Sequence, residues 1–456
     1  MLVLRSVNPA TGEEIASYDA HGPEAIEAAI ESADACHHRW RLAPFDERAS
    51  MLDAAAQQLE LRREPLARLM AEEMGKPIVD GRAEVDKCAW VCRYYAENGE
   101  AQLADTEIAT DRTKSYVHHE PLGVVLAVMP WNFPLWQVFR FAAPGLMAGN
   151  AGLLKHASNV SGSALAIEEV FQEAGAPEGL FTTLLIPSSE VRGIIEHPLV
   201  RAATLTGSDI AGRAVAAAAG AALKPTVLEL GGSDPYVVLA DADVSAAAAT
   251  CATARLINGG QSCIAGKRFI VDRRIHDDFV EAMVEAFQAR TVGDPLDEAT
   301  DIGPMARTDL RDECHDQVSA TIEAGAGLVL GGAVPDGPGA YYPPTILTGV
   351  KPGMAGADEE VFGPAAAIME VTDEEEAIRM ANTSEFGLGA AVFTSDREKG
   401  EHLAATRLEA GACFVNTNVA SDPRLPFGGI KNSGYGRELG VHGIQSFVNT
   451  KTVVVA

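Results

Sequence analysis

A cysteine at position 263 stands in a short glycine-rich segment, INGGQSCIAGKRFIV, which covers residues 257–271. Small residues surround Cys263 on both sides, and an apolar run typical of a strand follows it. A thiol on such an open loop could attack an electrophilic carbon, because a thiolate is an effective nucleophile. The alternative is a packing role, since free cysteine is among the most buried residue types and the chain has seven. The segment alone is compatible with both roles.

Two polar residues near the ends of apolar runs could assist such a nucleophile. Glu229 precedes Gly231 and Gly232, where a carboxylate could act as a general base, although an exposed loop acid would have the same sequence context. Asn132 lies in VMPWNFPLWQVFRF, between aromatic residues and two prolines. Its amide could donate to a developing oxyanion, a role worth about 3–4 kcal/mol where it has been measured. Thiol, amide and carboxylate are the groups that catalysis through an acyl-enzyme needs.

A glycine at a strand-to-helix turn offers a place for a phosphate group. In TLTGSDIAGRAVAAAAG (204–220), a predicted strand runs into Gly207 and Ser208, and Gly212 lies in the first turns of the following helix. A helix N-terminus supplies free N–H donors and a partial positive charge. Glycine at such a turn is structural more often than functional, and no GxGxxG motif follows a predicted strand. The turn is a weak signal when it is taken alone.

Alternating strands and helices must position these residues. Apolar runs that predict strands lie at 122–128, 151–155, 182–186, 202–206, 226–230 and 235–239, and a second set runs from 266 to about 415. Helical segments separate them, which indicates βαβ units and parallel sheets. We therefore expect two α/β domains with a change-over near 230–260, after a first hundred residues made of helices. Ligands of such sheets bind at the carboxyl ends of the strands.

Composition narrows the class of protein. The 456 residues are 47% apolar and 22% charged, as in globular proteins of two to three domains. A net charge of −28 argues against nucleic-acid or anionic-membrane partners, which need clustered Lys and Arg. No apolar run reaches the roughly 18 residues of a membrane helix, and the N-terminus lacks a signal-peptide pattern. The odd number of cysteines without zinc-type spacing predicts free thiols, no metal site and a cytoplasmic location.

Two extended segments stand apart from their neighbours, TKSYVHHEP at 113–121 and the tail SFVNTKTVVVA at 446–456. Isolated extended pieces of this kind often form a protruding sheet that pairs with another subunit. We therefore expect a homodimer or a homotetramer.

Five segments in order and spacing resemble the signature segments of the aldehyde dehydrogenase superfamily: MPWNFPLWQ, LELGGSDP, GGQSCIAGKR, EEVFGP and LPFGGIKNSGYGRELG. The resemblance covers the chain from NPATGE at 8–13 to TKTVVV at 450–455. It implies an α/β fold with three parts. These are a Rossmann-type NAD(P)-binding domain (1–102 and 122–229), an α/β catalytic domain (230–440) and a small β oligomerisation extension (103–121 and 441–456).

The resemblance also implies oxidation of a small-molecule aldehyde to a carboxylic acid. Cys263 would form a thiohemiacetal and, after hydride transfer, a thioester, while the Asn132 amide and the backbone N–H of Cys263 would hold the oxyanion. Glu229 would activate the water that releases the acid. Relatives that pass the acyl group to coenzyme A generally lack a glutamate there, so Glu229 favours hydrolysis. The non-enzyme alternative is a catalytically silent structural relative, and the intact set of Cys263, Glu229, Asn132 and Glu360 speaks against it.

For the cofactor, the resemblance implies NAD or NADP. Lys155 matches the lysine that reaches the adenine-side ribose, Glu360 the carboxylate on the nicotinamide ribose, and Phe362 the ring packed against nicotinamide. NAD-preferring members often carry a glutamate at the position of Ser158, and its absence here removes repulsion against a 2′-phosphate, so that NADP is tolerated. The full set of positions that match the cofactor site is Trp131, Lys155, Ser158, Gly207, Ser208, Gly212, Glu360 and Phe362.

For the substrate, Arg140 matches a position on the helix that lines the expected tunnel. Succinate-semialdehyde dehydrogenases resemble this chain in having arginine there, and a guanidinium can hold a distal carboxylate bidentately. A helix arginine paired with an internal acid is the structural alternative. Ser421 and Arg424 are a second candidate hydrogen-bonding point near the tunnel mouth. Ile257 stands where some of these enzymes have another arginine, which leaves glutarate semialdehyde as an alternative to succinate semialdehyde. If Arg140 is structural, general aliphatic or aromatic aldehydes are the alternative.

Overall fold

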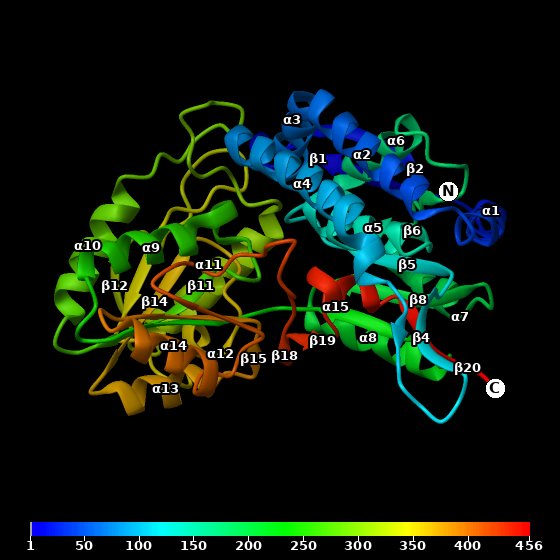
Figure 1. The fold of residues 1–456 in the computed structure, drawn as a ribbon. Coiled ribbons are helices and arrows are strands. Elements are labelled where there is room, and N and C mark those ends of the chain that lie inside the picture. Colours follow the sequence, from blue (N-terminus) through cyan, green and yellow to red (C-terminus); the bar gives the residue numbers. More distant parts are fainter. Residues whose placement is uncertain (1) are drawn as a thin grey trace.

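The computed structural model describes residues 2–456, which form two α/β lobes, each built on its own sheet (Figure 1). The change-over between the lobes lies between β9 (Thr226–Glu229) and β10 (Asp234–Val238), the last strand of the first βαβ series and the first of the second. Near its C-terminus the chain returns to the first lobe, where α15 (Gly440–Gln445) packs against α4 (Ile78–Gln102) and α5 (Trp136–Met147).

The first lobe contains a six-stranded sheet in the order β19-β9-β8-β5-β6-β7. Neighbouring strands are parallel, except that β19 is antiparallel to β9. Alternate residues of β5 enter different cores, because Val124 and Leu126 pack in one cluster and Val125 and Ala127 in the other. Both faces are therefore covered, which explains a strand without polar alternation. The remaining strands are β5 (Val124–Met129), β6 (Ala151–His156), β7 (Phe181–Thr183), β8 (Val200–Thr206) and β19 (Gly434–Tyr435).

Helices cover both faces of this sheet. On the face of Val124 and Leu126 lie α1 (Pro23–Trp40), α7 (Val191–Glu196) and α8 (Asp209–Ala221). The opposite face carries the larger helical layer at the top of Figure 1, which includes α4 and α5. Its other helices are α2 (Phe45–Leu61), α3 (Arg63–Met74) and α6 (Ser161–Glu173).

The second lobe contains a seven-stranded sheet in the order β12-β13-β14-β11-β10-β16-β17, parallel except between β12 and β13. Residues of α9 and α10 pack on one face and residues of α11–α14 on the other. Its strands are β11 (Gly266–Asp272), β12 (Gly327–Leu330), β13 (Thr345–Thr348), β14 (Ala365–Val371), β16 (Gly389–Phe393) and β17 (Ala412–Val415). Its helices are α9 (Val244–Leu256), α10 (His276–Gln288), α11 (Thr308–Glu323), α12 (Ala355–Asp358), α13 (Glu374–Asn382) and α14 (Arg397–Thr406).

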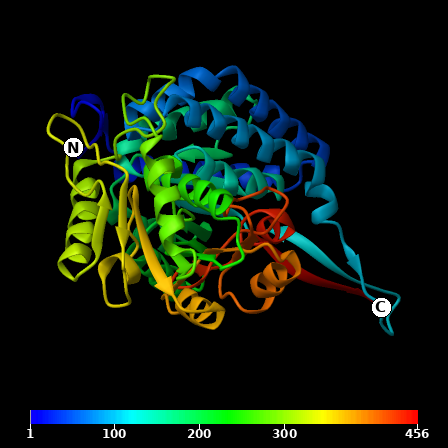
Figure 2. The same ribbon diagram turned by 90° about the vertical axis from the view of Figure 1, so that its left-hand side faces the viewer.

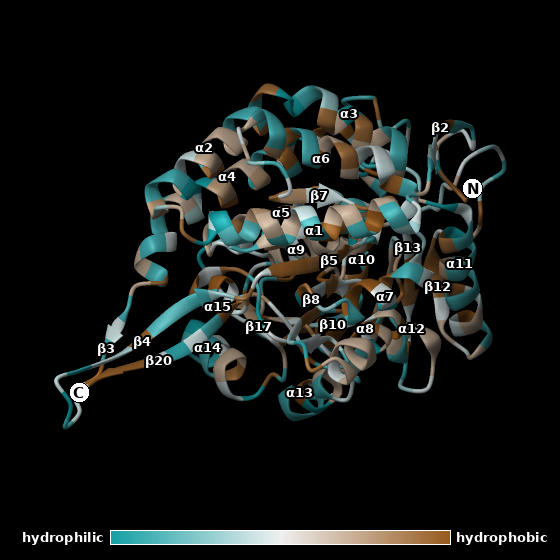
Figure 3. Cartoon of the chain, turned by 90° about the vertical axis from the view of Figure 1, so that its right-hand side faces the viewer, coloured by the Kyte–Doolittle hydropathy of each residue, from teal (hydrophilic) through white to brown (hydrophobic). Residues whose placement is uncertain are grey.

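The two isolated extended segments form a separate sheet. β4 (Lys114–Pro121) and β20 (Val448–Val455) pair antiparallel along their whole length, and β3 (Thr106–Glu107) adds a short third strand. This arm projects away from both lobes (Figure 2). Its C-terminal strand is hydrophobic near the tip (Figure 3), where Val454 and Val455 are exposed.

Four strands differ from the sequence-based expectation. β1 (Val3–Val7) and β2 (Glu14–Asp19) form a hairpin inside the stretch expected to be helical. β13 was not predicted, and β19 joins the first sheet although it falls within 230–440. These strands have only two to six residues, too few for a clear period. A further two-residue pair joins β15 (Phe386–Gly387) to β18 (Ile430–Lys431). None of the helices in residues 2–456 is long and apolar enough to span a membrane.

Candidate active site

Three of the predicted site residues follow neighbouring strands of the first sheet. β9, β8 and β5 are adjacent and parallel, and they end at Glu229, Thr206 and Met129. Glu229, Gly207 and Asn132 therefore lie at one edge of the sheet, the carboxyl edge at which such folds bind ligands. Cys263 reaches this edge from the second lobe, on the connection between α9 and β11. We call residues 257–265 the nucleophile loop.

The nucleophile loop has an unusual backbone. Asn258, Gly259 and Gly260 all have left-handed conformations, with φ of 53°, 62° and 76°. A β-carbon at Gly260 would clash with the carbonyl of Gly363, so only glycine fits there. The buried guanidinium of Arg255 donates to the carbonyls of both Gly260 and Gly363. The loop is thus fixed against the segment that carries Glu360 and Phe362.

Asn132 is buried and ties the loop after β5 to the nucleophile loop. The Nδ2 of Asn132 donates to the backbone carbonyl of Gln261 at 3.0 Å. In return, Nδ2 of Asn258 donates to the backbone carbonyl of Asn132 at 2.8 Å. A side-chain amide nitrogen carries two hydrogens, so one of them remains available for a further acceptor.

Lys267, which the sequence analysis did not select, organises the nucleophile from the other side. Its buried Nζ donates to the carbonyls of Ser262 and Cys263, both at 2.8 Å, and lies 3.1 Å from Oε1 of Glu360. Glu360 also accepts from the backbone N–H of Gly232 at 3.0 Å. One lysine therefore links the nucleophile to the carboxylate that the family resemblance assigns to the cofactor.

The Cys263 thiol and the Glu229 carboxyl group are both shielded from water and have charged side chains nearby. Burial raises the pKa of the Cys263 thiol to about 12, and the charges of Arg140 and Lys267 oppose that rise. Burial and the neighbouring Glu438 raise the pKa of Glu229 well above its ordinary value. Neither oxygen of Glu229 has a hydrogen-bond partner among residues 2–456. A carboxyl group with a raised pKa and no fixed partner is suited to accepting a proton during catalysis.

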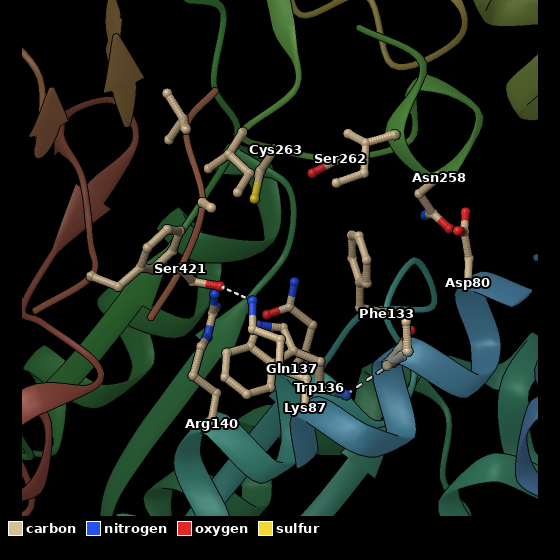
Figure 4. A pocket seen from close by; sticks show the side chains of 17 residues that line it. Asp80, Lys87, Phe133, Trp136, Gln137, Arg140, Asn258, Ser262, Cys263 and Ser421 are labelled. Atoms are coloured by element: carbon tan, nitrogen blue, oxygen red, sulfur yellow. Dashed lines mark hydrogen bonds between the residues drawn. The ribbon is translucent and has the colours of Figure 1, made fainter. Parts of the chain in front are cut away.

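A pocket of about 200 Å³ opens onto Cys263 (Figure 4). Most of its wall is apolar or aromatic, and its polar side chains include Lys87, Gln137, Arg140 and Ser421. Ile257 also lines it. Nζ of Lys87 donates to Oγ of Ser421 at 2.8 Å. The lysine comes from α4 and was not predicted as a site residue.

The sequence left two roles open for Arg140, binding of a substrate carboxylate and pairing with an internal acid, and the structure has features of both. It lines the pocket, and its guanidinium lies 4.7 Å from the centre of the Phe427 ring. It also forms an ion pair with the buried Glu438 and donates to Oγ1 of Thr206 at 3.2 Å. The internal acid of the structural alternative is therefore present, and Arg140 does not face the pocket as an uncompensated charge.

Arg424 does not join the pocket, contrary to the sequence-based expectation. Its guanidinium forms two hydrogen bonds with Asp422, at 2.9 and 2.6 Å, and lies over Trp90. The side chain is 66% exposed. Asp422, two residues away, holds the arginine at the surface through these hydrogen bonds. Ser421, in contrast, lines the pocket.

The turn at residues 206–209, which we call the phosphate turn, has room for a ligand. A β-carbon at Gly207 would have only Leu205 nearby, at 3.6 Å, so the protein's own packing does not fill that space. Oγ of Ser208 caps α8 by accepting from the N–H of Ala211 at 3.3 Å. Gly212 has a different role, because a β-carbon there would collide with Leu230 of the adjacent strand segment. It allows close packing of helix on sheet.

The remaining cofactor candidates also fit a dinucleotide. Lys155, at the end of β6, is buried and has no ion pair or hydrogen bond from its Nζ within residues 2–456. Burial lowers its pKa, so an anionic ligand would compensate its charge. Ser158 is exposed just beyond it. At the other end, Trp131 and Phe362 pack edge to face with ring centres 5.8 Å apart, which gives a flat ring an aromatic boundary.

Comparison with known proteins shows the family of the chain. The family model described as "Aldehyde dehydrogenase family" matches residues 3–453. The chain is 50% identical over 455 residues to a "Probable succinate-semialdehyde dehydrogenase", NADP(+), of Synechocystis sp., with 100% of both chains covered. It is 49% identical over 454 residues to the NADP(+) succinate-semialdehyde dehydrogenase of Mycobacterium avium, covering 99% of this chain and 96% of the other. The crystal structure of succinic semialdehyde dehydrogenase from Streptococcus pyogenes with NADP+ superposes with a TM-score of 0.97 at 38% identity, covering 99% of each chain.

Proposed function

The chain belongs to the aldehyde dehydrogenase family, and we propose that it oxidises succinate semialdehyde to succinate with NADP as the hydride acceptor. The observation that supports this substrate is a pocket that contains the Cys263 thiol together with Lys87, Arg140 and Ser421. A short aldehyde with a distal carboxylate matches these chemical features. Relatives about half identical over the full length carry the same activity in their names.

In the proposed reaction, the thiolate of Cys263 attacks the aldehyde carbon, and the carbonyl electron pair moves onto oxygen. The Asn132 amide and the Cys263 backbone N–H donate to that oxyanion and stabilise the thiohemiacetal. NADP, when bound, accepts the hydride from the former aldehyde carbon. Glu229 then takes a proton from a water molecule whose oxygen attacks the resulting thioester. Collapse of this adduct releases succinate and returns the thiolate.

Preference for NADP is supported by charge at the adenine-ribose end. Lys155 supplies a buried cation without an acidic partner in the described chain, and Ser158 puts no carboxylate there. Glu360 and Phe362 would face the nicotinamide end, where Lys267 fixes the carboxylate.

A substrate panel assayed with both cofactors tests the proposal. We expect the highest kcat/KM for succinate semialdehyde with NADP, lower values for glutarate semialdehyde, and the lowest for butyraldehyde and benzaldehyde. A panel in which the uncharged aldehydes react as well as succinate semialdehyde would contradict the substrate assignment.

We further propose that the arm of β3, β4 and β20 joins subunits in a homodimer or homotetramer. β20 is the longer of the two edge strands of this sheet, and its tip exposes Val454 and Val455. An exposed apolar edge strand is a template for pairing with another chain. Light scattering on Val454→Lys and on the parent protein tests this, since the substitution should shift the parent oligomer towards smaller species.

A further inference from the structure

Lys87 is a charged residue of the pocket that the family resemblance does not assign. It lies on α4, which belongs to the helical layer of the first lobe, and its side chain reaches the pocket that contains Cys263 (Figure 4). Besides Ser421, its Nζ contacts the ring of Trp136, 4.3 Å from the ring centre. The ammonium group is therefore oriented by one hydroxyl and one aromatic face.

No carboxylate in residues 2–456 forms an ion pair with Lys87. Asp80 and Glu84 line the same pocket, and the two acids whose charges act on Lys87, Glu84 and Asp422, are already engaged. Glu84 pairs with Lys76 and accepts from the backbone N–H groups of Leu135 and Trp136, each at 2.9 Å. Asp422 is held by Arg424, as described above. Lys87 thus differs from Arg140, whose charge is compensated by Glu438.

The electrostatic surroundings of Lys87 favour binding of an anion. Burial, and to a smaller extent the neighbouring charge of Arg140, lower the pKa of Lys87 to about 8, against opposing effects of Cys88, Glu84 and Asp422. A partly desolvated cation next to a second cation is destabilised, and a carboxylate placed between them would relieve that destabilisation.

We propose that Lys87 is a further anchor for the distal carboxylate of the substrate, in the same pocket as Ser421 and Arg140, and that it supplies the pocket charge that no protein carboxylate neutralises. This inference rests on the proposed function, because it presumes a carboxylated aldehyde. The carboxylate would accept from Nζ of Lys87 and from the hydroxyl of Ser421 while the aldehyde carbon meets Cys263. Specificity for carboxylated over uncharged aldehydes then depends on a residue of α4.

Steady-state kinetics of Lys87→Met with succinate semialdehyde and butyraldehyde test this inference. A charge-assisted hydrogen bond contributes about 1.5–3 kcal/mol, so kcat/KM for succinate semialdehyde should fall about 10- to 100-fold, mainly through KM. The kcat/KM for butyraldehyde should fall less than that for succinate semialdehyde, and an unchanged Tm shows that the variant folds. Lys87→Arg should retain most of the preference, and Lys351→Met, an exposed lysine, is the matched control.

The pH dependence separates a charge role from a packing role. Below its pKa Lys87 is protonated and holds the carboxylate, so the ratio of kcat/KM for the two aldehydes should fall as pH rises through about 8. Titration of Cys263 and Glu229 affects both aldehydes and cancels in the ratio. The charged and titratable groups around Lys87 are Arg140 on α5, Asp80, Glu84 and Cys88 on α4, and Asp422 in the loop between β17 and β18. Lys87→Met should give a ratio independent of pH, and Lys87→Arg should shift the fall to higher pH.

An unchanged preference in Lys87→Met, or an equal loss with both aldehydes, would overturn the anchor and leave the proposed function intact. A parent enzyme without preference for succinate semialdehyde would instead contradict the proposed function, and the anchor with it.

Discussion

The nucleophile loop and the phosphate turn both contain glycine at the edge of a sheet, but their surroundings differ. At Gly260 a left-handed φ and the nearby Gly363 carbonyl demand glycine, and Arg255 and Lys267 bind the carbonyls of the loop. At Gly207 the nearest neighbour of an added β-carbon would be Leu205 at 3.6 Å. The protein itself fixes the first segment and leaves space beside the second. The reacting thiol is therefore positioned before ligands bind. At the phosphate turn, the space beside Gly207 would be filled only when the cofactor binds.

The largest expected effect concerns the thiol that the nucleophile loop holds. Cys263→Ala should lower aldehyde oxidation by about 10⁴-fold or more, because no other group can form the covalent intermediate. Cys413→Ala is the matched control, since Cys413 is also a half-buried free cysteine with a raised pKa. Oxidation assays on both variants check this. Comparable losses in the two variants would contradict the special position of the nucleophile loop.

A pair of glycine substitutions tests the comparison directly. Gly260→Ala should lower the Tm, since a strained backbone costs about 1–3 kcal/mol and the added methyl group meets a carbonyl. Gly207→Ala should leave the Tm unchanged and raise KM for NADP about 10- to 100-fold, by displacing the phosphates. Thermal unfolding and cofactor titration measure the two effects. A lower Tm for Gly207→Ala would show that the phosphate turn is also fixed by internal packing.

The half-buried Cys263 thiol should also show a characteristic dependence on pH. With a pKa of about 12, Cys263 is protonated at neutral pH, and its reactive thiolate fraction increases as pH rises. Alkylation by iodoacetamide without cofactor should therefore accelerate about tenfold per pH unit between about pH 7 and pH 9. Mass spectrometry of the Cys263 peptide follows the rate. A plateau below pH 8 would mean that Arg140 and Lys267 outweigh burial.

The smallest effect concerns the ribose end of the cofactor site. Ser158→Glu places a carboxylate at an exposed position near Lys155, where repulsion of a 2′-phosphate amounts to about 1 kcal/mol. The ratio of kcat/KM for NADP to that for NAD should fall about fivefold. Ser158→Gln, which adds a similar side chain without charge, is the control. An equal fall in both variants would indicate a steric effect.

Sequence patterns could locate the catalytic set because its residues follow predictable elements. Glu229, Asn132 and Gly207 each come at or just after the end of an apolar strand, and parallel strands bring such ends together. Lys87 and Glu438 could not be found in this way. Lys87 lies 334 residues from Ser421 in the chain, and nothing local in a helix of 25 residues marks the face that reaches a pocket. Arg424 was expected to be a hydrogen-bonding point near the tunnel mouth, but its guanidinium is hydrogen-bonded to Asp422, two residues away.

Lys267 illustrates the same limit at shorter range. It stands four residues after Cys263, inside the quoted signature, yet its role depends on Glu360 of a distant segment. Every residue of strand β11 from Gly266 to Asp272 is buried. A buried lysine in such a strand is explained only by its contacts with the Cys263 carbonyl and with Glu360.

In the proposed reaction, Cys263 carries the acyl group and Glu229 activates the water that releases it. In Glu229→Gln, succinate semialdehyde and NADP should give one burst of NADPH per active site, followed by slow turnover. Mass spectrometry of the quenched enzyme should then find a succinyl thioester on the Cys263 peptide. A burst without an adduct on Cys263, or an adduct on another cysteine, would contradict the account.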